Sequence, residues 1–525
     1  MITLLDYGAG NVRSVINAIE SLGETVKVVT DPQDIINADK LVFPGVGAFG
    51  SMIASLKEKG FFEPLLYYLN SNKPFLGICL GLQALFKESE EAPGIKGLSF
   101  INGRVRRFPT NFCVPHIGWN GIKITQDSYI FNGLKGDEKF YFVHSFHVDP
   151  KDDSVVLTKT DYGYEFVSAI QKGNIIATQF HPEKSGHAGL KVFKNFISPP
   201  QTTYIPEIRL STTKLAKRII ACLDVRSNDQ GDLVVTKGDQ YDVREKGRVR
   251  NLGKPVELAR RYYEEGADEI TFLNITGFRD FPLKDMPMLE VLKETSKNVF
   301  VPLTIGGGIR DYTDKDGRFY SALDVASEYF RSGADKISIG SDAVLIVEEY
   351  LRNKKKTGKS SIEEISRVYG AQAVVISIDP RRIYVNSPDE TAHPVIETNL
   401  TGPNGQRYCW YQCTIKGGRE GRDVDAITLA KVCEELGAGE ILLNCIDRDG
   451  TNLGFDIELI KAVKSAVTIP VIASSGAGCE EHFYDVFKET DADAALAAGI
   501  FHRREVSIRA VKEYLKEKGV EIRNI

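Results

Sequence analysis

Residues 77–83 read G-I-C-L-G-L-Q and follow an apolar run. Cys79 stands between two glycines, Gly77 and Gly81. A strand that turns sharply into a helix leaves no room for side chains beside the turn residue, and this geometry accounts for both glycines. The turn residue then points outward at the positive end of the new helix, where a thiolate is favoured and the sulfur is a nucleophile. Most free cysteines are instead small buried residues, and the heptapeptide alone leaves both interpretations open.

The alternation of apolar runs with helical patterns continues on both sides of this turn. The runs ITLLDYG (2–8), KLVFPGVG (40–47) and KPFLGICLG (73–81) are each followed by a helical pattern, the last by LQALFKE (82–88). The later runs KFYFVHSF (139–146) and IIATQFHPEKS (175–185) indicate further strands. This order predicts an α/β domain with a mainly parallel sheet over residues 1–198.

Residues 199–214, PPQTTYIPEIRLSTTK, interrupt this rhythm with clustered prolines and hydroxyl residues. We therefore expect a linker there, between domains at 1–198 and 215–525. The second part contains eight apolar strand candidates, mostly separated by helical patterns, and this repetition predicts a (β/α)8 barrel. The candidates are 218–224, 269–275, 299–305, 336–340, 373–379, 440–446, 469–475 and 494–499.

The barrel half also repeats itself. GADEI (266–270) resembles GAGEI (437–441), VPLTIGGG (301–308) resembles IPVIASSG (469–476), and CLD (222–224) resembles SID (377–379). Three matches in the same order indicate the internal duplication of a half-barrel. Barrel strands resemble one another in any case, being short and apolar, but a barrel core does not select the matched Asp and Gly residues.

Composition excludes several classes of protein. Of 525 residues, 42% are apolar and 26% are charged, which is typical of a globular protein, and a net charge of −5 indicates neither a nucleic-acid nor a membrane partner. No apolar run approaches the ~20 residues of a membrane helix. The eight cysteines form no C-x-x-C pair and no His/Cys/Asp cluster has metal-ligand spacing, so we expect no metal and no other cofactor. Without a basic leader, we expect a cytoplasmic protein, or an organellar one if a transit peptide was removed.

A nucleophilic Cys79 needs a base and a group that orients the base. His181 and Glu183, in HPEKS (181–185), can share one face of an extended segment, so that His181 takes a proton and Glu183 holds its tautomer. The glycine-rich turn in LVFPGVG (41–47) can aim backbone N–H groups at a developing oxyanion. Read singly, these motifs have plain alternatives, a surface His–Glu pair beside a proline and a tight turn.

Together, GxCxGxQ, PGVG and HPEKS resemble the class I glutamine amidotransferases over most of residues 1–198. The resemblance implies that Cys79 attacks the amide of L-glutamine, that His181 relays the proton and that Glu183 orients His181. Ammonia is released, and glutamate leaves when the thioester is hydrolysed. The residues that the resemblance assigns to the oxyanion hole and to glutamine binding are Gly45, Val46, Leu80 and Gln83.

Two aspartates and several glycine-rich turns mark one end of the predicted barrel. Asp224 and Asp379 end the first and fifth strands, so they can work as acid and base across one mouth, or only cap the next helices. Turns after the third, fourth, seventh and eighth strands can bring N–H groups to phosphate. Their duplication favours phosphate-binding turns over plain connecting turns and predicts a substrate with a phosphate at each end. The candidates are Gly307, Gly308, Gly340, Ser341, Ser475, Gly476, Gly478 and Gly499. Residues 235–251 are either a lid, from which Lys237 reaches the site, or a solvated loop.

This half resembles the cyclase subunit of imidazole glycerol phosphate synthase, and both halves together resemble the fused, bifunctional form found in eukaryotes. The matching motifs include KRIIACLDV, TKG, FLNIT, GGGIR, GADKISIGSDA, AVVISID, IASSGAG and GAGEILLNCIDRDG, the last with Asp447 as a further substrate-binding candidate. The resemblance implies that ammonia joins a bis-phosphate formimino-aminoimidazole-carboxamide ribonucleotide (PRFAR). Imidazole glycerol phosphate and an aminoimidazole-carboxamide ribotide (AICAR) are then released, a step of histidine biosynthesis that needs no separate glutaminase subunit.

The resemblance also implies a dry path through the barrel that keeps ammonia neutral. Charged residues are costly to bury unpaired, and four of them start predicted strands and match the family's gate of salt-bridged charges. These are Arg218, Glu269, Lys336 and Glu440, for which an interface or stability role is the alternative. The family further implies that the PGVG turn reorients when the barrel binds its ligand, so we expect a weak glutaminase without that ligand.

Two features depart from the family pattern. Phe146, in HSF (144–146), stands where some relatives have Tyr, and residues 380–423 form a long insertion that is a candidate β-hairpin of unassigned function. Two rival functions are an ammonia donor for another acceptor and a non-catalytic metabolite-binding regulator. The doubled phosphate turns argue against the first, and the intact candidate catalytic residues argue against the second.

Overall fold

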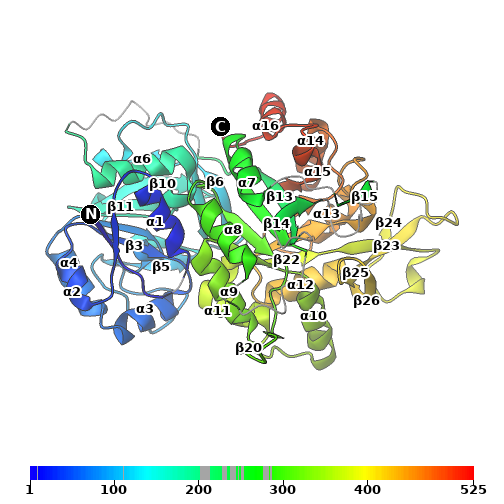
Figure 1. Ribbon diagram of the computed structural model, residues 1–525, viewed down its shortest axis with the longest axis horizontal. Coiled ribbons are helices and arrows are strands. Elements are labelled where there is room, and N and C mark those ends of the chain that lie inside the picture. Colours follow the sequence, from blue (N-terminus) through cyan, green and yellow to red (C-terminus); the bar gives the residue numbers. More distant parts are fainter. Residues whose placement is uncertain are drawn as a thin grey trace.

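The computed structural model describes residues 1–8, 10–109, 111–201, 213–227, 233–236, 244–245, 248–249, 254–275, 283 and 286–525. In them the chain forms two large sheets that lie side by side, one within residues 2–178 and one within residues 218–497 (Figure 1). Most of the expected linker lies outside the described residues, as does most of the stretch 235–251, including Lys237.

A mixed sheet forms the centre of the first part. Its parallel strands run in the order β2-β1-β3-β4-β12, and antiparallel strands extend it beyond β12. The parallel strands are β1 (Ile2–Leu4), β2 (Val26–Val28), β3 (Leu41–Gly45), β4 (Phe75–Cys79) and β12 (Ile175–Thr178). The others are β5 (Gly103–Arg107), β7 (Lys123–Ile124), β9 (Phe146–Pro150), β10 (Val156–Asp161) and β11 (Glu165–Lys172), while β6 (His116–Asn120) pairs with β8 (Phe140–His144). The predicted parallel sheet is thus the core of a larger α/β layer.

Helices cover both faces of this sheet. Along β3, Val42 and Phe43 point into different apolar cores, as the alternation of side chains along a strand requires. The core that holds Val42 is closed by α1 (Val12–Glu20) and α6 (Gly186–Ile197). The core that holds Phe43 is closed by α3 (Phe49–Glu58) and α4 (Phe62–Asn70), on which α2 (Pro32–Ile36) packs.

The helix expected at 82–88 is much shorter than the sequence pattern indicates. Only α5 (Leu80–Gln83) is helical, and it is one turn long. Beyond it, the backbone of 84–86 bonds to another segment, because Leu98 N–H donates to the Ala84 carbonyl and Ile101 N–H to the Leu85 carbonyl, both at 2.9 Å. These long-range bonds replace the local ones that would continue the helix.

The second part is a closed barrel of eight parallel strands among the described residues, as predicted. The chain closes it by pairing the last strand, β29, with the first, β13. The barrel strands are β13 (Arg218–Ser227), β17 (Glu269–Asn274), β18 (Leu303–Gly306), β21 (Lys336–Ile339), β22 (Val374–Ile378), β27 (Glu440–Asn444), β28 (Val471–Ser474) and β29 (Ala494–Ala497). Helices surround them: α7 (Pro255–Glu264), α8 (Pro287–Ser296), α9 (Ala322–Ser332), α10 (Ser341–Asn353), α11 (Ser361–Tyr369), α12 (Ala426–Leu436), α13 (Ile457–Lys464), α14 (Glu480–Thr490), α15 (Gly499–His502) and α16 (Ile508–Glu517).

Short antiparallel strands are added to the barrel. β14 (Leu233–Thr236) folds back on β13, and the pairs β15 (Arg244–Glu245) with β16 (Arg248–Val249) and β19 (Tyr312–Thr313) with β20 (Phe319–Tyr320) form ribbons. The insertion after β22 contains more strands than the expected hairpin, because β25 pairs with three other strands. These strands are β23 (Pro380–Val385), β24 (Ile396–Glu397), β25 (Tyr408–Ile415) and β26 (Glu420–Asp425).

The two parts meet at the N-terminal ends of the barrel strands. Trp119 Nε1–H donates to the Asp268 carbonyl at 3.0 Å, and Gly186 N–H donates to the Phe300 carbonyl at 3.0 Å. Both acceptors precede barrel strands, so the first sheet abuts the floor of the barrel. None of the helices in the described ranges is both long enough and apolar enough to cross a membrane.

Candidate active site

Cys79 lies at a strained strand-to-helix turn. It ends β4 with φ +53°, a left-handed conformation that residues other than glycine rarely adopt, and α5 begins at the next residue. A Cβ on Gly81 would lie 2.2 Å from the Phe43 carbonyl oxygen, and one on Gly77 would lie 3.0 Å from the Gly81 backbone. The two glycines are therefore required by the close approach of β3, β4 and α5, and the thiol is held at the tip of the turn.

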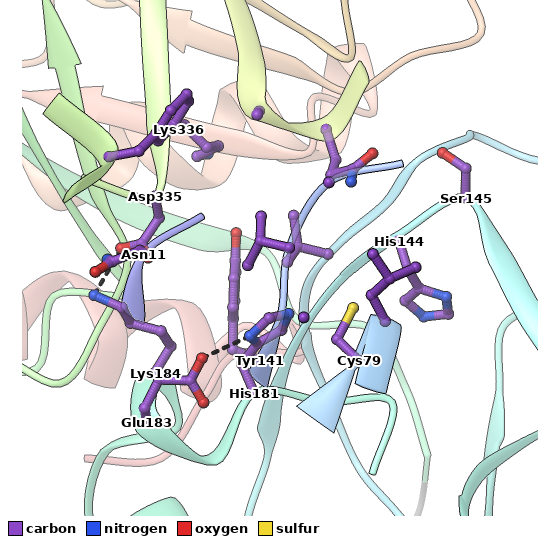
Figure 2. Close-up of a pocket in the computed structure, with 18 of the residues that line it drawn as sticks. Asn11, Cys79, Tyr141, His144, Ser145, His181, Glu183, Lys184, Asp335 and Lys336 are labelled. Atoms are coloured by element: carbon purple, nitrogen blue, oxygen red, sulfur yellow. Dashed lines mark hydrogen bonds and ion pairs between the residues drawn. The ribbon is translucent and has the colours of Figure 1, made fainter. Parts of the chain in front are cut away.

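His181 and Glu183 lie against the same cavity as Cys79 (Figure 2). His181 Nδ1 is 2.7 Å from Glu183 Oε1, although the backbone between them is a 3-10 turn, η3 (Pro182–Lys184), rather than the extended segment we expected. Burial disfavours a charge on this imidazole, but the Glu183 carboxylate and Cys79 outweigh burial and raise the pKa of His181 above its usual value. The pair can therefore hold a proton taken from the sulfur.

Gln179 is a contact of Cys79 that the sequence did not single out. Its side-chain N–H donates to Cys79 Sγ at 3.4 Å, and its carbonyl oxygen accepts from Gln83 Nε2 at 3.2 Å. Gln83 also donates to the Phe146 carbonyl at 3.1 Å, so its amide is engaged within the protein. Gln179 stands two residues before His181, but only the packing of β12 against β4 shows that its amide reaches the sulfur.

The turn after β3 lies directly against the Cys79 turn. Gly45 is the strand partner of Cys79, and a Cβ on Gly45 would lie 2.5 Å from Leu80 Cβ. The Val46 N–H donates to the Tyr7 hydroxyl at 3.1 Å. The structure thus brings Gly45, Val46 and Leu80 together beside the sulfur, and the Val46 N–H bonds to Tyr7.

Four buried charges close the floor of the barrel. Arg218 Nη1 lies 3.0 Å from Glu269 Oε2, and Arg218 Nη2 contacts Glu440. Lys336 Nζ lies 2.7 Å from Glu269 and 2.6 Å from Glu440, so each cation touches both carboxylates. All four side chains are at most 1% exposed. Burial disfavours the charge on Glu440, but Arg218 and Lys336 outweigh it and lower the pKa of that carboxyl. We refer to these four residues as the charge ring.

One cavity connects the Cys79 turn with the charge ring. Its walls include Cys79, His181 and Glu183 from the first part and Asp335 and Lys336 from the barrel (Figure 2). The cavity has a volume of 40 Å³, enough for a molecule the size of water. A small neutral product released at the sulfur would therefore meet the ring directly.

Asp224 lines a second cavity, of 100 Å³, at the C-terminal ends of the barrel strands. Asp449 lines it too and was not singled out by the sequence, in which it is one of two aspartates in IDRDG. Asp379 follows β22 and accepts a hydrogen bond from Asn444 Nδ2 at 2.9 Å. Burial raises the pKa of the Asp379 carboxyl, and the charge of Asp449 adds to this effect. The barrel mouth therefore carries carboxyl groups in different environments.

The glycine-rich turns after β28 and β29 contribute to this cavity. Ser475, Gly476 and Gly499 lie in its wall. Gly476 has φ +98°, and a Cβ there would lie 2.2 Å from the Gly454 carbonyl oxygen, so only glycine fits. The Gly478 N–H donates to His482 Nδ1 at 3.0 Å, and Gly478 is not part of the cavity wall.

The turns after β18 and β21 lie elsewhere on the same rim. Gly307 and Gly308 have φ +92° and +78°, and a Cβ on Gly307 would lie 2.1 Å from the Asn274 carbonyl oxygen. Gly340 precedes α10, and the hydroxyl of Ser341 accepts from Lys416 N–H at 3.0 Å.

Asp447 has a different environment from the glycine-rich turns. Its carboxylate accepts from Arg382 N–H at 2.7 Å and so fastens β23 of the insertion, and Asp447 does not line the Asp224 cavity. Lys237 lies outside the described residues. Within the described ranges, no group of three or more His, Cys, Asp or Glu side chains is arranged to hold a metal ion.

Comparisons with known proteins cover nearly the whole chain. Residues 3–198 match the family model described as glutamine amidotransferase class-I, and residues 218–507 match the one described as histidine biosynthesis protein. The imidazole glycerol phosphate synthase hisHF of Schizosaccharomyces pombe is 56% identical over 539 residues, which is 100% of both chains. The chloroplastic hisHF of Arabidopsis thaliana is 59% identical over 100% of this chain and 89% of its own length. The HisF subunit of Methanosphaera stadtmanae is 44% identical over 59% of this chain and 99% of its own.

The charge ring allows a test of stability. Lys336→Met leaves two buried carboxylates with one cation, so we expect the free energy of unfolding to fall by about 3–5 kcal/mol. Lys297→Met removes the cation of an exposed pair with Glu294 and should change it by about 0–1 kcal/mol. Thermal unfolding of both variants measures the difference. Adding Glu440→Gln to Lys336→Met should recover part of the loss, and a Lys336→Met protein as stable as the wild type would contradict the pairing.

Proposed function

The chain belongs to the family of fused imidazole glycerol phosphate synthases, and on that premise we propose how its residues share the reaction. It is an enzyme of histidine biosynthesis that carries a glutamine amidotransferase domain and a cyclase domain in one chain, so no separate glutaminase subunit is needed. The observation that carries the assignment of roles is the cavity that contains Cys79 and the His181–Glu183 pair and ends at the charge ring.

In the first domain, Cys79 attacks the amide carbon of L-glutamine. His181 takes the thiol proton and gives it to the departing nitrogen, so that ammonia and a thioester form, while Glu183 holds the imidazole. Water then cleaves the thioester to glutamate and the free thiol. The developing oxyanion is stabilised by backbone N–H groups of the two turns that meet at the sulfur, and Gln83 forms part of the wall that holds glutamine. These turns contribute Gly45, Val46 and Leu80.

In the barrel, Asp224 and Asp379 carry the acid–base steps. Ammonia adds to PRFAR, and cleavage with ring closure releases imidazole glycerol phosphate and AICAR. The raised pKa of Asp379 suits it to hold a proton, so we assign it the role of acid and Asp224 the role of base. The glycine-rich turns bind the two phosphates, with Ser475, Gly476 and Gly499 beside Asp224 and the turns of Gly307 and Ser341 across the mouth. The remaining candidates for substrate contact are Gly308, Gly340, Gly478, Asp447 and Lys237.

Ammonia passes from the first site to the second through the barrel, with the charge ring as its gate. In water near neutral pH most ammonia is protonated and is no nucleophile, so a dry route preserves its reactivity. The test supplies glutamine with a labelled amide nitrogen in a buffer of unlabelled ammonium. If this route is used, the product carries the label. Mass spectrometry of imidazole glycerol phosphate measures it, and a product whose label is diluted to the level of the buffer would contradict channelling.

We propose the domain division 1–198 and 215–525 with a linker at 199–214, which agrees with the ranges of the two family matches. The compartment is proposed to be a reducing one, the cytoplasm or an organelle, because each of the eight cysteines is a free thiol. Fractionation of cells that express the chain with a tag tests the compartment. A tagged chain found only among secreted proteins would contradict it.

Replacement of the nucleophile should separate the two activities. Cys79→Ala removes the attacking sulfur, so glutamine-dependent synthesis should fall at least about 10³-fold, while synthesis from ammonium salts continues. Asp224→Asn should abolish synthesis from either nitrogen source and leave glutamine hydrolysis measurable. Cys113→Ala, which removes another thiol of the same domain, is the matched control and should keep both activities. Glutamate release and imidazole glycerol phosphate formation are measured in parallel, and glutamine-dependent synthesis that survives Cys79→Ala would overturn the assignment.

The Glu183–His181 pair predicts a pH effect. Glu183→Gln keeps the shape of the side chain but removes the charge that raises the pKa of His181, so the imidazole should lose its proton at a lower pH. Activity falls on the alkaline side when His181 loses the proton that it gives to the departing nitrogen. The alkaline limb of the pH profile of glutaminase kcat/KM should therefore move to lower pH, with a lower kcat at neutral pH. Glu91→Gln, in the same cavity wall, is the control and should leave that limb in place. An unmoved limb in Glu183→Gln would show that Glu183 does not set the state of His181.

A further inference from the structure

Tyr7 holds both polar groups of the Val46 backbone. Its hydroxyl accepts a hydrogen bond from Val46 N–H at 3.1 Å and donates one to the Val46 carbonyl oxygen. The side chain is 4% exposed, and its ring packs edge-on against Phe43 of β3 with 5.9 Å between centroids. A single phenol thereby fixes the orientation of the turn that lies against Cys79.

This orientation removes a donor from the glutaminase site. The Val46 N–H that bonds to Tyr7 is not available to an oxyanion on the Cys79 side of the turn. The neighbouring Gly45 packs closely on Leu80, since a Cβ on Gly45 would lie 2.5 Å from Leu80 Cβ. Freeing the Val46 N–H therefore requires the backbone to rotate, and rotation requires both bonds to Tyr7 to break.

The barrel touches the same turn through one helix. Ala48 N–H donates to the Val368 carbonyl at 3.4 Å, and a Cβ on Gly47 would lie 2.9 Å from that oxygen. Val368 lies in the last turn of α11, whose first residue, Ser361, donates to Asp342 Oδ2 at 2.7 Å. Asp342 is in the first turn of α10, beside the glycine-rich rim of the barrel. α11 therefore connects the substrate end of the barrel with the turn beside Cys79.

We propose that Tyr7 is a positioning residue that keeps the Val46 N–H turned away from the glutaminase site until the barrel binds its bis-phosphate ligand. The proposal rests on the proposed function, because it requires the Gly45–Val46 turn to be part of the oxyanion hole. Ligand binding shifts α11 against Gly47 and Ala48, the bonds to Tyr7 break, and the N–H turns to the substrate. Neutral hydrogen bonds contribute little net free energy each, so binding of a ligand can reverse this restraint.

Tyr7→Phe tests the restraint, because it removes the hydroxyl and keeps the ring that packs on Phe43. The basal glutaminase kcat, without ligand, should rise about tenfold, since two neutral hydrogen bonds of ordinary strength bias a two-state equilibrium by about that factor. The ligand-stimulated kcat and the KM for glutamine should stay near their wild-type values, so the stimulation ratio falls by the same factor. Glutamate release by the full chain, with and without PRFAR, measures all of these quantities.

Tyr68→Phe is the matched control. Tyr68 is a buried tyrosine of the same domain, and its hydroxyl donates to the Pro74 carbonyl at 2.7 Å, at the end of β4 opposite Cys79. It should leave the stimulation ratio unchanged. If Tyr7→Phe shows an unchanged basal rate with a normal stimulated rate, the role of Tyr7 is overturned and the proposed function stands. A fall of both rates in Tyr7→Phe would also overturn it, because it would show a structural role only.

Discussion

The charge ring is the interaction on which the rest of this architecture depends. Arg218 and Lys336 each contact Glu269 and Glu440, so four charges are buried at the floor of the barrel without leaving one unpaired. Replacing such a network by apolar side chains is often neutral or stabilising, so packing alone does not explain its presence. The proposed gate would account for it, because the bonds within the ring can exchange for bonds to a small polar molecule.

The same region joins the two domains mechanically. Glu183 orients His181, the next residue, Lys184, pairs with Asp335 at 2.7 Å, and Asp335 is followed by Lys336 of the ring. Asn11 Nδ2 adds a bond to Asp335 at 2.8 Å (Figure 2). Glu183 is thus two peptide bonds and one ion pair away from Lys336 of the charge ring, a short connection between the two domains.

Strain and restraint coincide where the domains meet. Cys79 adopts a left-handed backbone conformation that the packing of Gly77 and Gly81 enforces, and this exposes the sulfur to its cavity. In the adjoining turn, both polar groups of the Val46 backbone bond to the Tyr7 hydroxyl. At the far mouth of the barrel, Asp224 lines a cavity, while Asp379 accepts a bond from Asn444 and has a pKa that burial raises.

The sequence by itself determined the barrel, the sharp turn at Cys79 and the identity of the main candidates, because strand periodicity and glycines at close approaches are local signals. It predicted too long a helix after Cys79, where bonds to a distant segment replace local ones, and too simple a form for the insertion at 380–423, where β25 pairs with β23 and β24 as well as with β26. Only the tertiary structure decided that Gln179 reaches the sulfur, that Tyr7 holds Val46 and that Asp449 joins Asp224. Those contacts link residues far apart in the chain. Neither spacing nor composition shows which side chains will lie within hydrogen-bonding distance once the chain is packed.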